Sequence, residues 1–547
     1  MKFIILFFII TINLIGVPRN YYFSSQSGND TTGNGTIGNP YRNPNYKIDA
    51  TFIAALVPGD SILFKRGETW RPTSFSTSLL YFQTTLAGVS GNPIVFGAYG
   101  TGAKPILDCS GVADRNVIKM QVGDMSYVNF EDLHFIGRMV FQTVTGNTTG
   151  YHHIKFLRCT LKGGYKLAGN STGYNYSQIY FQAIKGGVWS YALEIAPDVH
   201  SFAAPINNIE VGYCIFDSSA GISCISDADN NWYHHNVFNY TNWGSFVNVS
   251  GGSNIVIEYN TMSNITTAYY GMKIEPQVAQ INNLTLRFNL IKNAAGTGVA
   301  ARNIQDSKIY NNTILANYSA GTMAAVTFGF DVNNIPVNYG AAQVPQVGFQ
   351  NNIIANNIFI GRITAKQALH VSITYKNASN VIYSLPGLDS TNYWYNNLIR
   401  DPACITNYGS NIVVAASYWL GTSEMHYDST VSGNYRSDAD QASADVNYKQ
   451  TGIPNITSYW VAGYASGNIY SDPLFQSAVF SGAGTYTNLR LSQTSPARKA
   501  GIYITGMPAI DIEGLPYNRN HPNIGCYQNY NPPTKSTSVN PRIRREK

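Results

Sequence analysis

The chain has 547 residues, of which 44% are apolar and only 12% are charged, and its formal net charge is +6. This apolar fraction excludes a disordered chain, because it allows a sizeable core to be buried. The last six residues contribute +3 of the charge, which leaves a nearly neutral body and argues against nucleic acid as a partner.

The chain begins with Lys2 followed by an uncharged, largely apolar stretch from Phe3 to Val17. This pattern is typical of a secretory signal peptide, and the stretch is shorter than the about 20 residues that a spanning helix needs. We therefore predict a signal peptide at residues 1–17 and a protein that is secreted, extracellular or at the cell surface. No stable membrane insertion is expected after the signal is removed.

Residues 18–125 are expected to form an N-terminal cap and the first coils of a larger structure. A helix is predicted from Ile48 to Leu56, and Pro58-Gly59-Asp60 is typical of a turn that leads into a strand from Ser61 to Phe64. Such a helix would cover the open end of a stack of strands, whose edges would otherwise remain unpaired.

The central residues 126–400 repeat a short phrase in which apolar residues flank an asparagine. Two clear copies are Ile255-Val-Ile257-Glu-Tyr-Asn260-Thr-Met262 and Leu284-Thr-Leu286-Arg-Phe-Asn289-Leu-Ile291. The asparagine recurs at spacings of 24, 29, 23, 45 and 40 residues, at Asn236, Asn260, Asn289, Asn312, Asn357 and Asn397. Repeats of about 20 to 50 residues indicate a solenoid, in which each coil stacks on its neighbours.

The phrase also matches half of the leucine-rich repeat pattern, which expects a further leucine before it and a helical stretch after it. Only two of the four preceding positions fit, since they hold Ala228, Gly252, Ile281 and Ile304. After the phrase, residues 271–276 and 298–303 alternate small or apolar with polar residues, as strands do. Several strands per coil and no helix predict an all-β parallel β-helix.

The recurring asparagine has a structural explanation. Asparagine tolerates left-handed backbone angles at a bend, and stacked amides can bond to one another when coils lie about 4.8 Å apart. Cys159 and Cys214 occupy the same slot in earlier copies and are expected to stack there. The six cysteines are scattered and are expected to be mainly buried and apolar, which leaves room for one disulfide.

Residues 401–530 are expected to form the C-terminal coils and a cap, and residues 531–547 a basic disordered tail. Motifs near the start are Tyr21 to Asp30, Gly38 to Tyr41, Val57 to Trp70, Ser90 to Val95 and Lys104 to Asp108. Motifs near the end are Asp472 to Phe475, Leu489 to Ser492, Ser495 to Ala497 and Asp511 to Gly525. Their succession resembles the exported right-handed parallel β-helix proteins of the pectate-lyase-like superfamily. The resemblance implies the right-handed fold and export, and says little about the reaction.

Aligning the coils on the asparagine identifies outward-facing charges. Glu258 and Arg287 alternate with inward apolar residues, and His234 falls in the same column one coil earlier. In the following strand Lys273 and Glu275 face outward. Arg302 lies beside Glu275 on the next coil, so the six side chains are predicted to share one or two neighbouring faces of three coils.

These residues suggest a site for an acidic polysaccharide or a surface glycan. The protein itself is expected to be a monomer. A uronate lyase neutralises the sugar carboxylate and removes the adjacent proton. Lys273 would be the base, Arg302 and Arg287 the clamp, and His234 and Glu258 further catalytic candidates. Glu275, Asp227 and Asp229 are candidate calcium ligands, and no other cofactor is suggested. The structural alternative is that Glu258 with Arg287, and Glu275 with Arg302, form ion pairs between coils.

Comparison with known lyases leaves the reaction open. The family that includes chondroitinase B and alginate lyases carries a Lys on one coil and an Arg on the next, similar to Lys273 and Arg302 here. Its K-S-x-x-N and R-H-G phrases and its paired calcium-binding Glu are missing. A glycoside hydrolase using Glu258 with Glu275, or Asp227 with Asp229, is a second hypothesis. A non-catalytic adhesin or glycan-binding solenoid is a third, with Trp189, Trp232, Trp243 and Trp394 as aromatic candidates.

Overall fold

The computed structural model places strands over most of the part that it describes. The described residues are 16–72, 78–110, 116–120, 124–143, 150–162, 165–166, 174–175, 178–183, 206–217, 221–225, 229–241, 245–265, 270–276, 280–294, 296–316, 325–331, 349–361, 369–374, 392–400, 414–420, 423–428, 465–469, 471–477 and 488–529. The chain forms two compact units, Met1–Trp232 (unit 1) and Tyr233–Lys547 (unit 2).

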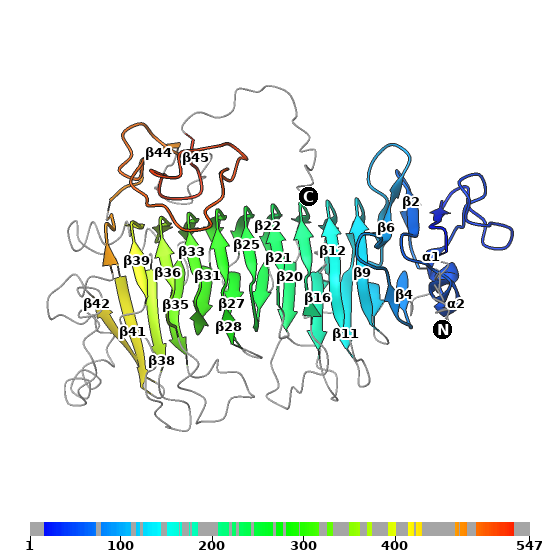
Figure 1. Ribbon diagram of the computed structural model, residues 1–547, viewed down its shortest axis with the longest axis horizontal. Coiled ribbons are helices and arrows are strands. Elements are labelled where there is room, and N and C mark those ends of the chain that lie inside the picture. The colour runs from blue at the N-terminus through cyan, green and yellow to red at the C-terminus, as the bar shows by residue number, and fades with distance from the viewer. Residues whose placement is uncertain are drawn as a thin grey trace, which may run out of the picture. The chain divides into compact units, whose positions relative to one another are not determined.

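Unit 1 contains three parallel sheets, which we number in the order in which each coil visits them (Figure 1). Sheet 1 consists of β1 (Asn20–Phe23), β2 (Ser61–Lys65), β6 (Ile94–Tyr99), β9 (Met125–Glu131), β12 (Tyr151–Leu157) and β18 (Glu210–Gly212), with β5 (Leu86–Ala87) and β17 (Ile206–Asn207) beside β9 and β12. Sheet 2 consists of β3 (Thr69–Trp70), β7 (Ile106–Asp108), β10 (His134–Ile136), β13 (Thr160–Lys162) and β19 (Ile215–Asp217). Sheet 3 consists of β4 (Leu80–Phe82), β8 (Asn116–Met120), β11 (Arg138–Thr143), β16 (Gln178–Ala183) and β20 (Gly221–Ile225), and β14 (Tyr165–Lys166) pairs separately with β15 (Tyr174–Asn175).

Unit 2 repeats this arrangement. Its sheet 1 consists of β21 (Trp232–His234, of which the first residue ends unit 1), β25 (Val256–Glu258), β29 (Thr285–Arg287), β33 (Lys308–Tyr310), β36 (Ile353–Ala355), β39 (Tyr393–Tyr395) and β43 (Ala465–Ser466). Sheet 2 consists of β22 (Val237–Thr241), β26 (Thr261–Ile265), β30 (Leu290–Ala294), β34 (Thr313–Ala316), β37 (Ile358–Ile360) and β40 (Leu398–Arg400). Sheet 3 consists of β23 (Val247–Val249), β27 (Tyr270–Ile274), β31 (Thr297–Arg302), β35 (Val326–Asp331), β38 (Leu369–Thr374), β41 (Val414–Leu420) and β42 (Ser423–Asp428).

Three short strands follow sheet 3 in unit 2, namely β24 (Gly252–Ser253), β28 (Ile281–Asn282) and β32 (Ile304–Gln305). Successive coils therefore contribute strands to the three long sheets in turn, and the coil β25–β26–β27–β28 adds one of the short strands. This is the predicted right-handed parallel β-helix. The helices in the described residues are short, α1 (Pro44–Lys47) and α2 (Ala50–Ala54), and none is long and apolar enough to cross a membrane.

The predicted helix at Ile48–Leu56 is present in shortened form as α2. The Asp49 carboxylate accepts a hydrogen bond from the Phe52 N–H, which caps its first turn. The predicted turn follows, because the Asp60 N–H bonds to the Val57 carbonyl and Gly59 has a φ of +93°. The strand after this turn is β2.

The asparagine ladder of unit 2 is confirmed. Each amide oxygen accepts two hydrogen bonds from the preceding ladder asparagine, as when Asn289 Oδ1 binds the backbone N–H and the side-chain amide of Asn260 at 3.1 and 3.0 Å. The ladder runs through all six predicted positions and ends at Asn468, which the repeat did not predict. In unit 1, Cys159 and Cys214 stack as predicted, since the Cys159 N–H points at the Cys214 sulfur at 3.4 Å.

One part of the ladder explanation is wrong. The left-handed backbone belongs to the residue before the ladder asparagine, such as Tyr259 (φ +56°) or Asn356 (φ +57°). We call these positions the corner residues, and in unit 2 they are His235, Tyr259, Phe288, Asn311, Asn356 and Asn396. The ladder asparagine points into the core, where its amide satisfies buried backbone groups, and the corner residue points outward.

The four cysteines whose side chains are described, Cys109, Cys159, Cys214 and Cys526, are buried, and none of the four is in a disulfide. Cys404 and the side chain of Cys224 lie outside the described part. Burial raises the pKa of Cys109 and of Cys526 to about 12, although nearby hydrogen bonds lower it slightly. These thiols therefore behave as small apolar core residues.

The C-terminal part of unit 2 returns over the coils. Strand β44 (Phe475–Ser477) pairs with β45 (Asn488–Leu491), antiparallel and separate from the three long sheets. Residues 497–529, which we call the strap, lie against the side of the coils formed by β25, β29, β33 and β36 (Figure 1). The sequence analysis assigned these residues to C-terminal coils and a cap, and in the structure they cover an outer face of earlier coils.

Candidate functional site

Sheet 1 of unit 2 brings three predicted site residues into one column. Ile257 pairs with Leu286, and both are fully buried, so Glu258 and Arg287 pair on the opposite face of the sheet. The His235 N–H bonds to the Glu258 carbonyl, which aligns His234 with Glu258 on the preceding coil. The predicted register is therefore confirmed.

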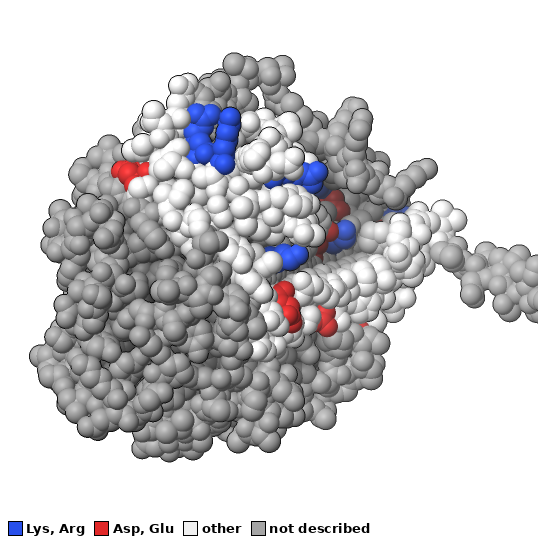
Figure 2. Space-filling model, turned by 60° about the vertical axis from the view of Figure 1, so that its left-hand side comes forward, with Lys and Arg blue, Asp and Glu red and all other residues white. Residues whose placement is uncertain are grey.

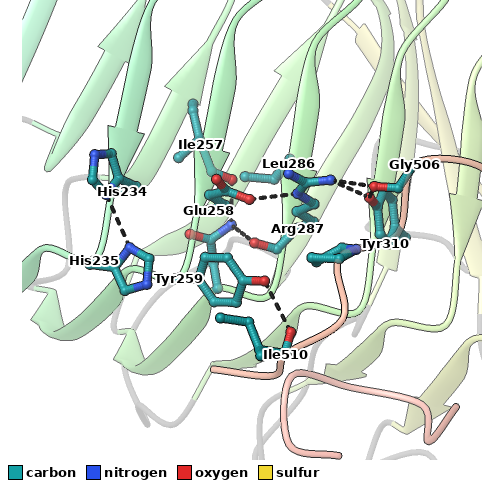
Figure 3. Close-up of polar contacts among 12 residues, drawn as sticks. His234, His235, Ile257, Glu258, Tyr259, Leu286, Arg287, Tyr310, Gly506 and Ile510 are labelled. Atoms are coloured by element: carbon teal, nitrogen blue, oxygen red, sulfur yellow. Dashed lines mark hydrogen bonds and ion pairs between the residues drawn. The ribbon is translucent and has the colours of Figure 1, made fainter. Parts of the chain in front are cut away.

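Arg287 is the centre of what we call the arginine cluster, which consists of His234, His235, Glu258, Tyr259, Arg287 and Tyr310. Its Nε donates to Glu258 Oε2 at 2.6 Å, and its Nη1 donates to the Tyr310 hydroxyl at 2.9 Å (Figure 3). The same Nη1 donates to the Gly506 carbonyl of the strap at 2.7 Å. The ion pair that the sequence offered as the structural alternative is thus formed.

The charge of Arg287 is stabilised by its neighbours in the cluster. Burial works against the charge of Arg287, but Glu258 and Tyr310 outweigh it and raise the pKa of the guanidinium. Burial also raises the pKa of Tyr310, with Arg287 acting in the opposite direction. Arg287 therefore stays charged and Tyr310 stays protonated at any physiological pH.

The two histidines lie beside this pair. Their Nδ1 atoms are 3.0 Å apart, and the His235 ring stacks on Tyr259 with centroids 4.7 Å apart (Figure 3). Burial, and secondly His234, lower the pKa of His235 to about 4. The Tyr259 hydroxyl donates to the Ile510 carbonyl of the strap at 3.0 Å, so Tyr259 also helps to hold the strap in place.

The sequence analysis expected Glu258 and Arg287 on an exposed outer face, and that expectation is wrong. Glu258 is only 5% exposed, because the strap lies over this side of sheet 1. The residues that close it, Gly506 and Ile510, are 219 and 251 positions away from their partners Arg287 and Tyr259. No local pattern indicates a contact of that range.

Sheet 3 of unit 2 holds the other three predicted residues, which we call the lysine cluster. Lys273 pairs in register with Ala300 and Ile274 with Ala301, which places Glu275 beside Arg302. Lys273 Nζ lies 3.5 Å from Glu275 Oε2, and Arg302 Nη1 lies 3.6 Å from Glu275 Oε1. Glu275 is 5% exposed, whereas the side chains of Lys273 and Arg302 are 25% and 23% exposed.

The six predicted residues therefore divide between two sheets. Glu258 and Glu275, offered as a paired-carboxylate site, lie on different sheets, and each carboxylate already contacts at least one cation. A hydrolase site needs two carboxylates that face the same glycosidic bond. The described geometry does not bring this pair together.

The structure describes the proposed calcium site only in part. Asp227 lies outside the described part, and Asp229 belongs to unit 1, whereas Glu275 belongs to unit 2. Both Glu275 oxygens face cationic side chains, although calcium needs a shell of oxygen ligands. In the described ranges, no group of three or more His, Cys, Asp or Glu side chains is placed to hold a metal ion.

The aromatic candidates divide in the same way. Trp232 is 39% exposed, Trp394 is 7% exposed and packs against Phe328, and Trp189 and Trp243 lie outside the described part. Sequence reasoning missed Tyr310 and Tyr259. Tyr310 could have been found, because it follows Arg287 in the same column one coil later.

Several solved structures are similar to this chain. A lacto-N-biosidase of glycoside hydrolase family 136 from Eubacterium ramulus is 16% identical with a TM-score of 0.42, and the match covers 69% of this chain and 67% of that chain. Pectate lyase Pel9A is 14% identical with a TM-score of 0.34, over 94% of this chain and 97% of that one. A mannuronic acid specific family 6 lyase from human gut microbiota is 15% identical with a TM-score of 0.33, over 63% and 76%. The sequence matches no family model and no curated protein, and no residue role is carried over from these structures.

Proposed function

We propose that this chain is an exported, carbohydrate-active enzyme that cleaves a uronate-containing polysaccharide by β-elimination at the lysine cluster. The observation that carries the proposal is that Lys273 and Arg302, on adjacent coils, reach the two oxygens of one buried carboxylate. Two cationic side chains from adjacent coils thus meet at one buried carboxylate. Both cationic side chains are about a quarter exposed, which suits an acidic ligand that arrives from solvent.

The proposed reaction uses these groups as follows. Arg302 binds the carboxylate of the uronate and stabilises the negative charge that develops there. Lys273 in its neutral form removes the proton from the carbon next to that carboxylate. The electron pair of that C–H bond forms a double bond, the glycosidic C–O bond breaks, and the leaving oxygen takes up a proton from water. The Lys273 ammonium then returns its proton to the hydroxide that is left. Glu275 would orient both cations, and no step requires calcium.

The lysine cluster suits this role better than the arginine cluster. Arg287 already uses Nε and Nη1 for Glu258, Tyr310 and Gly506, and the strap covers it. Its predicted part in the clamp would need the strap to move. Lys273 and Arg302 contact no residue of the strap in the hydrogen bonds and ion pairs of the described residues.

The test is the formation of an unsaturated sugar, followed by ultraviolet absorbance with alginate, polygalacturonate and chondroitin as substrates. We expect Lys273→Ala and Arg302→Ala each to lower kcat/KM by about 100-fold or more, as for loss of a proton-transfer or charge-stabilising group. Lys273→Arg keeps the charge but is too basic to accept the proton, and should be as inactive as Lys273→Ala. Lys292→Ala, on β30 of sheet 2, is the matched control and should keep full activity.

Three results would contradict the proposal. Full activity in both alanine variants would show that Lys273 and Arg302 are not the catalytic residues. New reducing ends without the absorbance would indicate a hydrolase. Binding of the polysaccharides without turnover would indicate a glycan-binding protein, the third class that the sequence allows.

A further inference from the structure

The strap makes a tight turn directly over the outer face of sheet 1 in unit 2. The Met507 N–H donates to the Ile504 carbonyl at 2.9 Å, which closes a four-residue turn over Ile504–Met507. Gly506, the third residue, has a φ of +87°, the value that a type II turn requires there. The turn fixes the directions of the peptide carbonyls at Thr505, Gly506 and Met507.

Each of these three consecutive carbonyls accepts a hydrogen bond from a different cationic side chain. Lys308 Nζ donates to Thr505 at 3.2 Å, Arg287 Nη1 to Gly506 at 2.7 Å, and Arg519 Nη1 to Met507 at 3.1 Å. Consecutive Cα atoms are about 3.8 Å apart, so the three cationic nitrogens gather within roughly 12 Å of one another. We call this group the turn cluster.

The turn cluster carries uncompensated positive charge. A carbonyl satisfies a hydrogen bond but supplies no negative charge. Glu258 neutralises Arg287, whereas Lys308 and Arg519 form no ion pair with an acidic side chain within the described residues. Three cations and one carboxylate thus leave a net charge of +2 around the turn.

The turn is open to solvent on its outer side. Thr505 and Gly506 are exposed, and no heavy atom lies within 4 Å of the position that a Cβ on Gly506 would occupy. Tyr503, directly before the turn, is 49% exposed and offers an amphipathic ring beside it. Figure 2 shows acidic and basic side chains around a recess, among described residues that are mostly uncharged.

We propose that the turn cluster, with Tyr503, is a second binding site for a carboxylate-bearing polysaccharide, distinct from the lysine cluster on sheet 3. The ligand class rests on the proposed function, and the positive charge and the open turn are independent of it. A sugar carboxylate would lie between Lys308 and Arg519 above Gly506, and the Tyr503 ring would contact the sugar face. Repeated uronates along one chain can occupy such a site while others occupy the lysine cluster, which raises the effective concentration of substrate.

The experiment measures binding without turnover, in a Lys273→Ala/Arg302→Ala background that removes the lysine cluster. The probes are polygalacturonate and alginate, with hydroxyethyl cellulose as the neutral polymer and dextran sulfate as the sulfated one. We expect the background protein to bind both polyuronates, and Lys308→Ala/Arg519→Ala to weaken that binding about 10-fold or more, since two charge-assisted contacts are lost. Binding should also weaken with added salt. Tyr503→Ala, at an exposed position, tests the ring separately and should weaken binding less.

Lys292→Ala, which removes one positive charge where the double variant removes two, is again the control and should bind as the background does. Thermal unfolding of each variant verifies that it is folded. We expect folded variants, because Lys308 is partly exposed and Arg519 is exposed. The proposal is overturned if the background protein binds no polyuronate, if Lys308→Ala/Arg519→Ala binds as tightly as the control, or if only dextran sulfate is retained. Loss of turnover in the lysine-cluster variants with retained binding here would separate the two sites.

Discussion

At the scale of single residues, the corner positions decide what each coil presents outward. A left-handed backbone at a residue other than glycine or asparagine costs roughly 1 kcal/mol, so His235, Tyr259 and Phe288 need compensation there. They obtain it from one another, since His235 stacks on Tyr259 and Tyr259 stacks on Phe288 with centroids 5.5 Å apart. Asn311 and Asn356 continue the column with residues that tolerate the conformation.

Protonation of His235 makes the stability of the protein depend on pH. Its pKa of about 4, below the ordinary value of 6.5, means that the folded protein favours the neutral ring. Stability is therefore complete above pH 6.5, and falls as the pH drops from 6.5 towards 4, by at most about 3 kcal/mol. We predict that stability falls less between pH 6.5 and 4 in His235→Asn than in the wild type, because asparagine tolerates the same backbone and does not titrate. Urea unfolding at pH 4.5, 5.5, 6.5 and 7.5 measures it, and parallel pH profiles for the two proteins would disprove the assignment.

At the scale of elements, the asparagine ladder joins each sheet 1 strand to the next sheet 2 strand. Asn289 donates its side-chain amide to the Ile257 carbonyl and to Asn312, and accepts two bonds from Asn260. All of these groups are buried, so water cannot replace the amide. The ladder therefore holds adjacent coils in register.

We predict that Asn289→Ala destabilises unit 2 by roughly 2 to 4 kcal/mol, because it leaves buried donors and acceptors on two coils unsatisfied. Asn289→Cys should cost less, since a thiol occupies this slot in unit 1 and accepts a backbone N–H there. The measurement is the urea midpoint of the transition of unit 2, with Asn283→Gly at an exposed amide as the control for asparagine loss. Equal stability of Asn289→Ala and wild type would show that the ladder contributes nothing.

This element was predictable from the sequence, and so was its register. A fixed period places asparagines above one another, and strand alternation then separates Ile257 from Glu258 and Met272 from Lys273. The same reasoning predicted both ion pairs between coils. It misjudged the left-handed position by one residue, because side-chain identity alone does not distinguish the amide that enters the core from the residue that turns the corner.

At the scale of the whole molecule, the strap ties the end of the chain to earlier coils. The corner residues supply most of the bonds: Asn396 donates to the Ala500 carbonyl, Asn356 to Ile502, and Asn311 to Asn523. Apolar side chains complete the contact, with Met507 and Ile504 packed near Phe288 and Tyr310. The strap thus covers aromatic and apolar corners that sheet 1 would otherwise expose.

The sequence could not predict this arrangement. Solenoid periodicity describes contacts between neighbouring coils, and the strap contacts span 104 to 251 residues without any repeat. Its motifs resemble terminal coils, and that resemblance carries no information on which face they cover. The burial of Glu258 and the formation of the turn cluster both depend on the strap. The sequence therefore predicted which residues pair between coils, but not which of them are accessible to solvent.

Asn356 offers the sharpest test of the strap. Its side chain donates to the Ile502 carbonyl at 2.7 Å and accepts from the Ile502 N–H at 2.9 Å, so one residue holds both backbone groups of one strap position. Asn356→Gly keeps the left-handed backbone at φ +57° and removes these two bonds, together with the 3.3 Å hydrogen bond that the Asn356 amide donates to Asn311 Oδ1. We predict that hydrogen exchange at the Ile502 amide becomes about 10-fold faster or more, as local opening of the strap becomes easier. Asn283→Gly is the matched control and should leave that exchange unchanged. Asn283 also has a left-handed backbone, and its amide bonds to Asn254 and not to the strap. Equal acceleration in both variants would mean that glycine loosens the coils generally, and unchanged exchange in Asn356→Gly would mean that apolar packing alone holds the strap.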